Sequence, residues 1–197
     1  LITPSSPGGW QTVAPSAVGH NPNEPAPKAL DLAEMAAIKE AFAQAALRAE
    51  RAGVDFIELH GAHGYLLHQF MSPLANLRTD EYGGSSANRM RFPIEVFAAV
   101  RAVYRGVLGI RVSASDWAQG GWTPEETIIL AQALKAHDIS YIHVSSGGVS
   151  YQQKIHLGPG YQVSFAKQVK AATGIPTITV GLITEPQQAE DILQAGD

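Results

Sequence analysis

The sequence contains no cysteine among its 197 residues. This absence excludes disulfides, thiolate nucleophiles and cysteine-ligated zinc or iron–sulfur centres. The sequence also has no run of 18 apolar residues and no N-terminal signal pattern, so we expect no membrane partner and a cytoplasmic location. Lysine and arginine number 14 against 18 aspartates and glutamates, and no basic cluster runs along the chain, so we expect no nucleic-acid partner.

Prolines and glycines recur throughout residues 1–30, which predicts an extended surface segment. After it, Asp31 and Glu34 form a capping-box pattern, and apolar residues recur at helical spacing until Gly53. We therefore expect the first long helix between these points.

Strands and helices then alternate along the chain. Thr123, with Pro124 and Glu126 after it, marks one helix start, and Thr184 with Gln187 marks another. A further helix contains Pro93, which should kink it or mark its first turn. Residues 64–86 form a long loop, expected to belong to the active site. The expected strands are 54–59, 108–113, 141–145 and 177–180, and the expected helices are 88–104, 162–173 and those starting at 124 and 185.

The two faces of these strands differ in polarity. One face is apolar and consists of Ile57, Leu59, Ile110, Val112, Ile142, Val144, Ile178 and Val180. The other is mostly polar and consists of Glu58, His60, Arg111, Ser113, His143, Ser145, Thr177, Thr179 and Gly181. An open sheet covered on both sides needs two apolar faces, whereas a barrel needs only the face toward its helices. We therefore predict an α/β fold, a partial (β/α)₈ TIM barrel forming a single domain over residues 1–197. A buried ion-pair network of Glu58, Arg111 and His143 is the alternative interpretation of the polar face.

Three side chains that can handle protons follow the first strand. His60 and His63 can converge on one oxygen as hydrogen-bond donors, and Tyr65 can supply a proton. Metal binding is a competing interpretation, but only His143 offers a further ligand at a strand end, so we expect no metal. Simple hydrogen bonding within the loop is a third interpretation.

One long pattern extends this motif as far as Phe92. It comprises HGAHGYL at 60–66, QF at 69–70, SP at 72–73, Asn76, RTD at 78–80, YGG at 82–84, NR at 88–89 and RF at 91–92. Shorter matches are Trp10, APSA at 14–17, IRVS at 110–113 and VGLI at 180–183. Together they resemble the old yellow enzyme family of FMN-dependent NAD(P)H ene-reductases, in particular the bacterial subgroup that includes xenobiotic reductases and bacillar NADPH dehydrogenases.

The resemblance implies a role for each site residue. His60 and His63 would bind the carbonyl or nitro oxygen of the substrate, and Tyr65 would give a proton to its α-carbon. Arg111 would lie at N1 and the C2 oxygen of FMN, and Gly181 would let the backbone approach the FMN phosphate. The implied hydride donor is NADPH or NADH, the substrate is a small enone-type molecule, and the parent protein is expected to be a homo-oligomer.

The number of strands does not reach that of a whole barrel. A (β/α)₈ barrel takes about 250 residues, and the resemblance makes the strands here the fourth to the seventh. Because the sequence also starts at Leu1, we expect it to be a piece of a longer protein. The alternative function is therefore a truncated, inactive barrel fragment that does not retain FMN.

Two further groups of polar residues are assigned no catalytic role. We expect the charged residues of the long loop, Arg78, Asp80, Arg89 and Arg91, to satisfy one another in a surface network. We expect the remaining histidines to be incidental, namely His20, His68, His137 and His156.

Overall fold

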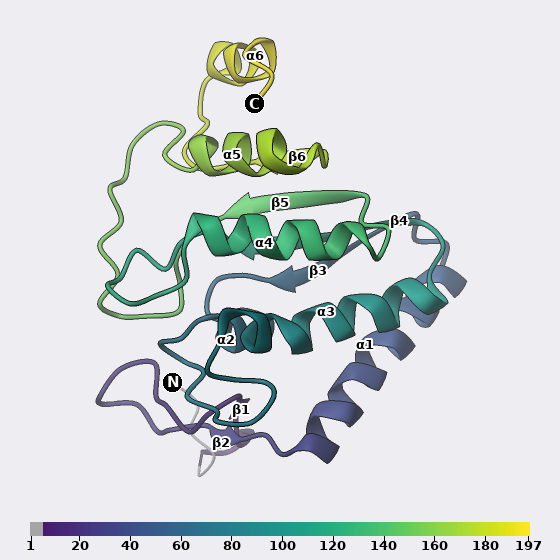
Figure 1. The fold of residues 1–197 in the computed structure, drawn as a ribbon, viewed down its shortest axis with the longest axis vertical. Coiled ribbons are helices and arrows are strands. Elements are labelled where there is room, and N and C mark those ends of the chain that lie inside the picture. The colour runs from purple at the N-terminus through teal and green to yellow at the C-terminus, as the bar shows by residue number, and fades with distance from the viewer. Residues whose placement is uncertain (1–5) are drawn as a thin grey trace.

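The computed structural model describes residues 6–197, which form a parallel sheet of four strands flanked by helices, with a separate two-stranded pairing near the N-terminus (Figure 1). The strands are β1 (Val13–Ala14), β2 (Lys28–Ala29), β3 (Phe56–Gly61), β4 (Val107–Ser113), β5 (Tyr141–Ser145) and β6 (Thr177–Thr179). The helices are α1 (Leu32–Arg51), α2 (Leu66–Met71), α3 (Ser86–Val103), α4 (Pro124–Lys135), α5 (Val163–Thr173) and α6 (Pro186–Gln194).

The order of the main sheet identifies the architecture. Its strands pair in the sequence β3-β4-β5-β6, and every pair is parallel. A doubly wound sheet would reverse direction at a switch point, whereas a barrel adds each new strand beside the previous one. The predicted partial TIM barrel is therefore confirmed.

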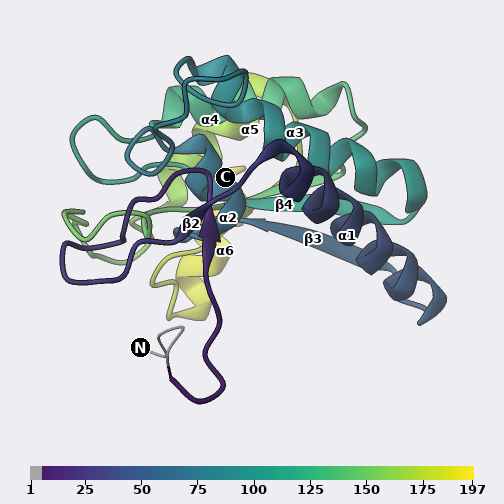
Figure 2. The same cartoon turned by 90° about the horizontal axis from the view of Figure 1, so that it is seen from below.

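The apolar strand face packs against helices, as predicted. Figure 2 shows α1, α3, α4 and α5 on one side of the sheet. The buried strand residues on that side are Leu59, Leu108, Ile110, Val112, Ile142 and Val144. Side chains of the helices complete the same core, among them Phe97, Val100, Leu130, Leu134, Ala166 and Val169. Burial of this apolar surface holds the helices to the sheet.

Two of the three predicted helix starts are confirmed. The Asp31 side chain accepts a hydrogen bond from the Glu34 N–H in a complete capping box, and Thr123 does the same at the start of α4. The start predicted at Thr184 is wrong, because the N-cap of α6 is Glu185. Pro186 occupies the first helical position, which makes its immediate neighbour the cap.

The long loop contains a helix that the sequence did not predict. Residues 66–71 form α2, whose inward side is fully buried at Leu67 and Phe70. The next helix, α3, is capped by Ser85, and Pro93 lies inside it rather than in its first turn. The loop is therefore held at its start by the buried side of α2 and at its end by the Ser85 cap of α3.

The predicted faces of β6 are wrong. The register places Thr177 beside Ile142 and Ile178 beside His143. Paired residues of parallel strands point to the same face, so Thr177 and Thr179 lie on the helix side and Ile178 lies on the polar side. Threonine and isoleucine are both β-branched and suit either face of a strand, so the alternation was assigned one residue out of phase.

The N-terminal segment is mostly irregular, as predicted, yet it is attached to the domain. β1 and β2 pair in parallel, and the neighbouring Ala14 and Leu30 are buried. The part of the predicted 1–30 segment that precedes Ser6 lies outside the described residues. Across residues 6–197, no helix combines the length and the apolar character needed to cross a bilayer.

Candidate functional site

Polar side chains gather where β3, β4 and β5 end. The strand register places His60 beside Arg111, Arg111 beside His143, and Ser113 beside Ser145. These residues share one face of the sheet, opposite the helices, because they are register partners. In a barrel, this end of the strands is where catalytic residues lie.

The three predicted catalytic side chains come together at the end of β3, although His60 lies within that strand and not after it as predicted. Here the chain makes a turn in which His63 and Gly64 both adopt left-handed conformations, with φ of 57° and 77°. The His60 ring centroid lies 5.3 Å from that of His63 and 5.2 Å from that of Tyr65. Tyr65 is 63% exposed, so its hydroxyl is accessible to a ligand.

His63 is held by serines of the next two strands. Its backbone N–H donates to Ser113 Oγ at 3.0 Å, and its Nε2 lies 2.7 Å from Ser145 Oγ. Because the Ser145 hydroxyl donates to Gln162 Oε1 at 3.3 Å, it accepts from His63, whose ring proton is therefore on Nε2. Strand alternation placed both serines on the polar face but did not predict their contact with His63.

Both imidazoles of the pair are uncharged at neutral pH. Burial, followed by the positive charge of Arg111, lowers the pKa of His63 from 6.5 to about 4. The same two causes lower the pKa of His60. A neutral imidazole has one N–H donor and one acceptor nitrogen, so each ring can offer one N–H to a bound oxygen.

Arg111 has an unsatisfied donor on this polar face. Its Nε is buried and has no hydrogen-bond partner within residues 6–197. Nearby, His143 Nδ1 lies 3.0 Å from a Glu58 oxygen, and the Tyr141 hydroxyl donates to the same carboxylate at 3.2 Å. The alternative ion-pair network thus forms between Glu58 and His143 without Arg111. A buried guanidinium N–H needs an acceptor, which a ligand in the barrel can supply.

The predicted surface network of the long loop is confirmed for Arg78 and Asp80 but is wrong for Arg89, which is buried and bonds to residues outside the set. Arg78 bonds to Asp80 with its Nε at 3.0 Å, and Arg91 Nε donates to a backbone carbonyl at 2.8 Å. Arg89 reaches Glu126 at 2.6 Å, so this network also ties the loop to α4.

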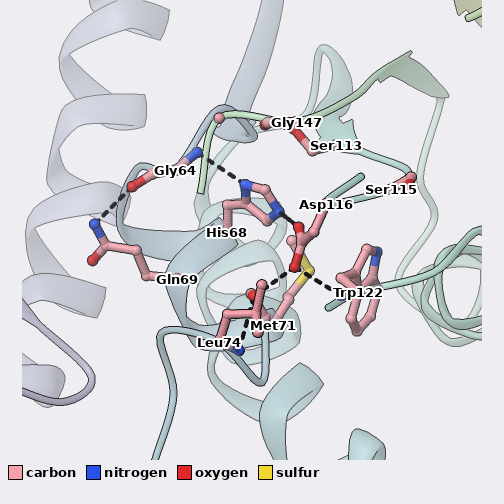
Figure 3. A network of polar contacts seen from close by, with 12 residues as sticks. Gly64, His68, Gln69, Met71, Leu74, Ser113, Ser115, Asp116, Trp122 and Gly147 are labelled. Atoms are coloured by element: carbon pink, nitrogen blue, oxygen red, sulfur yellow. Dashed lines mark hydrogen bonds and ion pairs between the residues drawn. The ribbon is translucent and has the colours of Figure 1, made fainter. Parts of the chain in front are cut away.

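The prediction that His68 is incidental is wrong. His68 is completely buried, and its Nε2 lies 2.8 Å from Asp116 Oδ1 (Figure 3). Its Nδ1 accepts a hydrogen bond from the Gly64 N–H at 2.9 Å. The only local signal was the four-residue spacing between Gly64 and His68, because Asp116 is 48 residues away in sequence.

Comparison with known proteins identifies the family. A family model described as the NADH:flavin oxidoreductase / NADH oxidase family matches residues 5–197. The chain belongs to this family. It is 45% identical over 186 residues to an NADPH dehydrogenase of Geobacillus thermodenitrificans, an alignment that covers 94% of this chain and 54% of that protein. The chain therefore spans about half the length of the curated relatives it matches.

Solved structures agree with this family assignment. Morphinone reductase in complex with tetrahydroNAD, in its N189A variant, superimposes with a TM-score of 0.76 at 31% identity, covering 96% of this chain and 54% of the reductase. A complex of 2-naphthoyl-CoA reductase gives a TM-score of 0.85 at 27% identity, covering 95% of this chain and 30% of the other. The resemblance to the old yellow enzyme family is confirmed.

The residues present fit a flavin at the polar face. The unpartnered Nε of Arg111 can donate to an acceptor on the flavin ring. Gly181 has a φ of +115°, a backbone conformation that by itself already favours glycine. Its contact with a phosphate stays a prediction. Residues 6–197 contain no group of three or more histidine, aspartate or glutamate side chains placed to hold a metal ion.

Proposed function

We propose that this protein reduces activated C=C bonds with NAD(P)H in an FMN-dependent reaction. The observation that carries the proposal is the gathering of His60, His63 and Tyr65 beside Arg111, whose buried Nε lacks a partner within residues 6–197. Bound FMN would supply the hydride chemistry, by accepting a hydride from NADPH or NADH and delivering it to the β-carbon of an α,β-unsaturated carbonyl or nitro compound.

His60 and His63 bind the substrate oxygen in this proposal. Each neutral ring offers one N–H, and two such donors stabilise the negative charge that develops on the oxygen as the β-carbon gains a hydride. The N–H that His63 would offer to the substrate is on Nε2, and in this structure it is donated to the Ser145 hydroxyl. Since Ser145 also bonds to Gln162, the serine keeps a partner when a substrate oxygen replaces it.

Tyr65 completes the addition by donating its hydroxyl proton to the α-carbon of the substrate. Its ring stands beside that of His60, and its side chain is largely exposed. One hydride and one proton thus convert the double bond to a single bond. Arg111 would stabilise negative charge on the flavin ring, and the backbone at Gly181 would approach the phosphate.

A combination of spectroscopy and substitution tests this function in the full-length gene product. The purified protein is expected to show flavin absorbance that NADPH bleaches and that an enone restores under anaerobic conditions. His60→Ala or His63→Ala should each lower turnover by about 10² to 10³, as expected for loss of one oxyanion donor. If phenol-type ligands bound the double variant as tightly as the unmodified protein, the assignment of the histidine pair would be wrong.

The alternative is an inactive barrel fragment. It is favoured by the outer edges of β3 and β6, neither of which has a neighbouring strand within residues 6–197. A full-length gene product that is colourless and takes up no added FMN would support this alternative over the reductase.

A further inference from the structure

We propose that His68 and Asp116 are positioning residues that hold the turn at residues 63–64, and with it the side chains of His63 and Tyr65. The inference rests on the proposed function, because it gives these two side chains their catalytic roles. His68 and Asp116 are both fully buried, so they touch neither substrate nor cofactor and can act only through the turn.

The turn needs support from its surroundings. A left-handed backbone is unfavourable for a residue with a side chain, and His63 has a φ of 57°. Gly64 continues the left-handed path, and a Cβ on it would lie 2.1 Å from the carbonyl oxygen of Gly148. Such a conformation persists only when neighbouring contacts determine it.

Both polar groups of Gly64 are bound by side chains of α2. The Gly64 N–H donates to His68 Nδ1 at 2.9 Å, and the Gly64 carbonyl accepts from Gln69 Nε2 at 2.6 Å (Figure 3). Helix α2 therefore bonds back to the turn that precedes it. The conformation of the turn depends on the orientation of the His68 ring.

Asp116 determines that orientation and the position of the ring proton. Because Nδ1 of His68 accepts from Gly64, the ring proton is on Nε2 and is donated to Asp116 Oδ1 at 2.8 Å. The other carboxylate oxygen accepts from Ser72 Oγ at 2.6 Å and from the Trp122 N–H at 2.7 Å. Three donors thus stabilise a carboxylate that has no contact with water.

The turn is consequently held from two sides by the end of β4. Ser113, the last residue of β4, accepts from the His63 N–H and donates to the Gly147 carbonyl at 2.8 Å. Three residues later, Asp116 holds His68 and, through it, Gly64. Loss of the second attachment should let the turn relax and withdraw the His63 ring from its place beside β5.

The substitution Asp116→Asn tests this in the full-length gene product with FMN. It keeps the shape of the side chain, but the amide can donate to Nε2 of His68, which moves the ring proton to Nδ1 where it opposes the Gly64 N–H. We expect the pKa of His63, measured by NMR of the labelled imidazoles, to rise from about 4 toward its ordinary 6.5 as the ring leaves its buried site. Turnover with an enone should fall by about 10²-fold, as for a misplaced reacting group.

Asp138→Asn is the matched control, because Asp138 is exposed and precedes β5 at the opposite end of the sheet. It should change neither the His63 titration nor turnover. A folded Asp116→Asn protein with an unchanged His63 titration would overturn the proposal. If that variant does not fold, the tautomer of His68 in the unmodified protein decides, since a proton on Nδ1 contradicts the argument and one on Nε2 supports it.

The outcomes also separate this inference from the proposed function. A protein that binds no FMN, yet has the Nε2 tautomer of His68 and the expected shift in His63, would refute the reductase and keep the positioning role. A protein that reduces enones, but whose Asp116→Asn variant has an unchanged pKa of His63, would support the reductase and refute the positioning role.

Discussion

His63 combines an unfavourable backbone conformation with a half-buried, uncharged ring. Its N–H and its ring are bound to serines of two different strands, Ser113 and Ser145. Burial and the charge of Arg111 both disfavour a proton on the ring. The residue that we propose to bind substrate is therefore also one that the fold must keep neutral.

The neutrality of His63 predicts a pH dependence of stability. The unfolded chain binds a proton near pH 6.5, whereas the folded chain does so only near pH 4. Between these values the unfolded state holds more protons, so the free energy of unfolding falls as the pH is lowered through this window. Urea midpoints measured at about pH 7 and pH 5 should show the loss. His63→Gln should reduce it, whereas the exposed His156→Gln should leave it unchanged.

Tyr65 is expected to act in only one half of the reaction. Tyr65→Phe keeps the ring and removes the hydroxyl, so it should slow reoxidation by an enone and leave reduction by NADPH nearly intact. Stopped-flow absorbance of the two half-reactions measures both rates. Equal slowing of the two would indicate a packing role for the ring beside His60.

Arg111 is expected to set the reduction potential of the flavin. Arg111→Met keeps much of the side-chain length but removes the positive charge, so negative charge on the flavin ring loses its stabilisation. The midpoint potential should become more negative in a spectroelectrochemical titration. An unchanged potential would instead favour a structural role for Arg111 near the Glu58–His143 pair.

At the scale of elements, the turn after β3 fits against the loop after β5. Gly148 has a φ of +100°, and a Cβ on it would lie 2.5 Å from backbone atoms of His63. The two loops can approach this closely only because glycine stands at both contact points, Gly64 and Gly148. Their contact fixes one active-site loop against another.

Alanine substitutions should separate this close contact from backbone strain. Gly174, which ends α5 with a φ of 69°, has open space where a Cβ would lie, so Gly174→Ala should cost only the left-handed strain of about 1 to 2 kcal/mol. Gly148→Ala adds an overlap with the backbone and should cost roughly 1 to 3 kcal/mol more. Urea unfolding compares the two, and equal losses would contradict the close packing.

The sequence predicts the longer elements well and the short ones poorly. The capping boxes at Asp31 and Thr123 identify helix starts because they are local chemistry. Helix α2 has no side-chain cap and only six residues, too few for a periodic pattern, and β6 has three, too few to fix the phase of its faces. In the site, His60, His63 and Tyr65 are close in sequence and were predictable. The His68–Asp116 pair depends on tertiary folding across 48 residues and was not.

At the scale of the whole molecule, the sheet is open along two edges. The outer sides of β3 and β6 have no strand beside them within residues 6–197. Apolar side chains are exposed where the edge strand β3 and its neighbour β4 begin, namely Val54, Phe56 and Val107. Unpaired strand edges beside apolar surface favour association with another chain.

The 197-residue chain produced alone is therefore expected to self-associate and to bind FMN weakly or not at all. Size-exclusion chromatography with light scattering gives its mass, and the absorbance spectrum reports any flavin. The full-length gene product serves as the comparison. A stable, yellow monomer of 197 residues would contradict this expectation.

The glycine contact between the two active-site loops also bears on recombination between relatives. Gly64 and Gly148 belong to segments that are far apart in the chain, yet each leaves room for the backbone of the other segment. Consider a chimera that takes β3 and its turn from one parent, and β5 and its loop from a second parent that lacks the glycine equivalent to Gly148. The side chain at that position would overlap with the backbone of the turn after β3. Crossover points within α1 or α5 keep both glycines in one parental block, whereas a crossover within α4 separates them. The segments that must come from the same parent are thus the loops that follow β3 and β5, because these two loops contact each other.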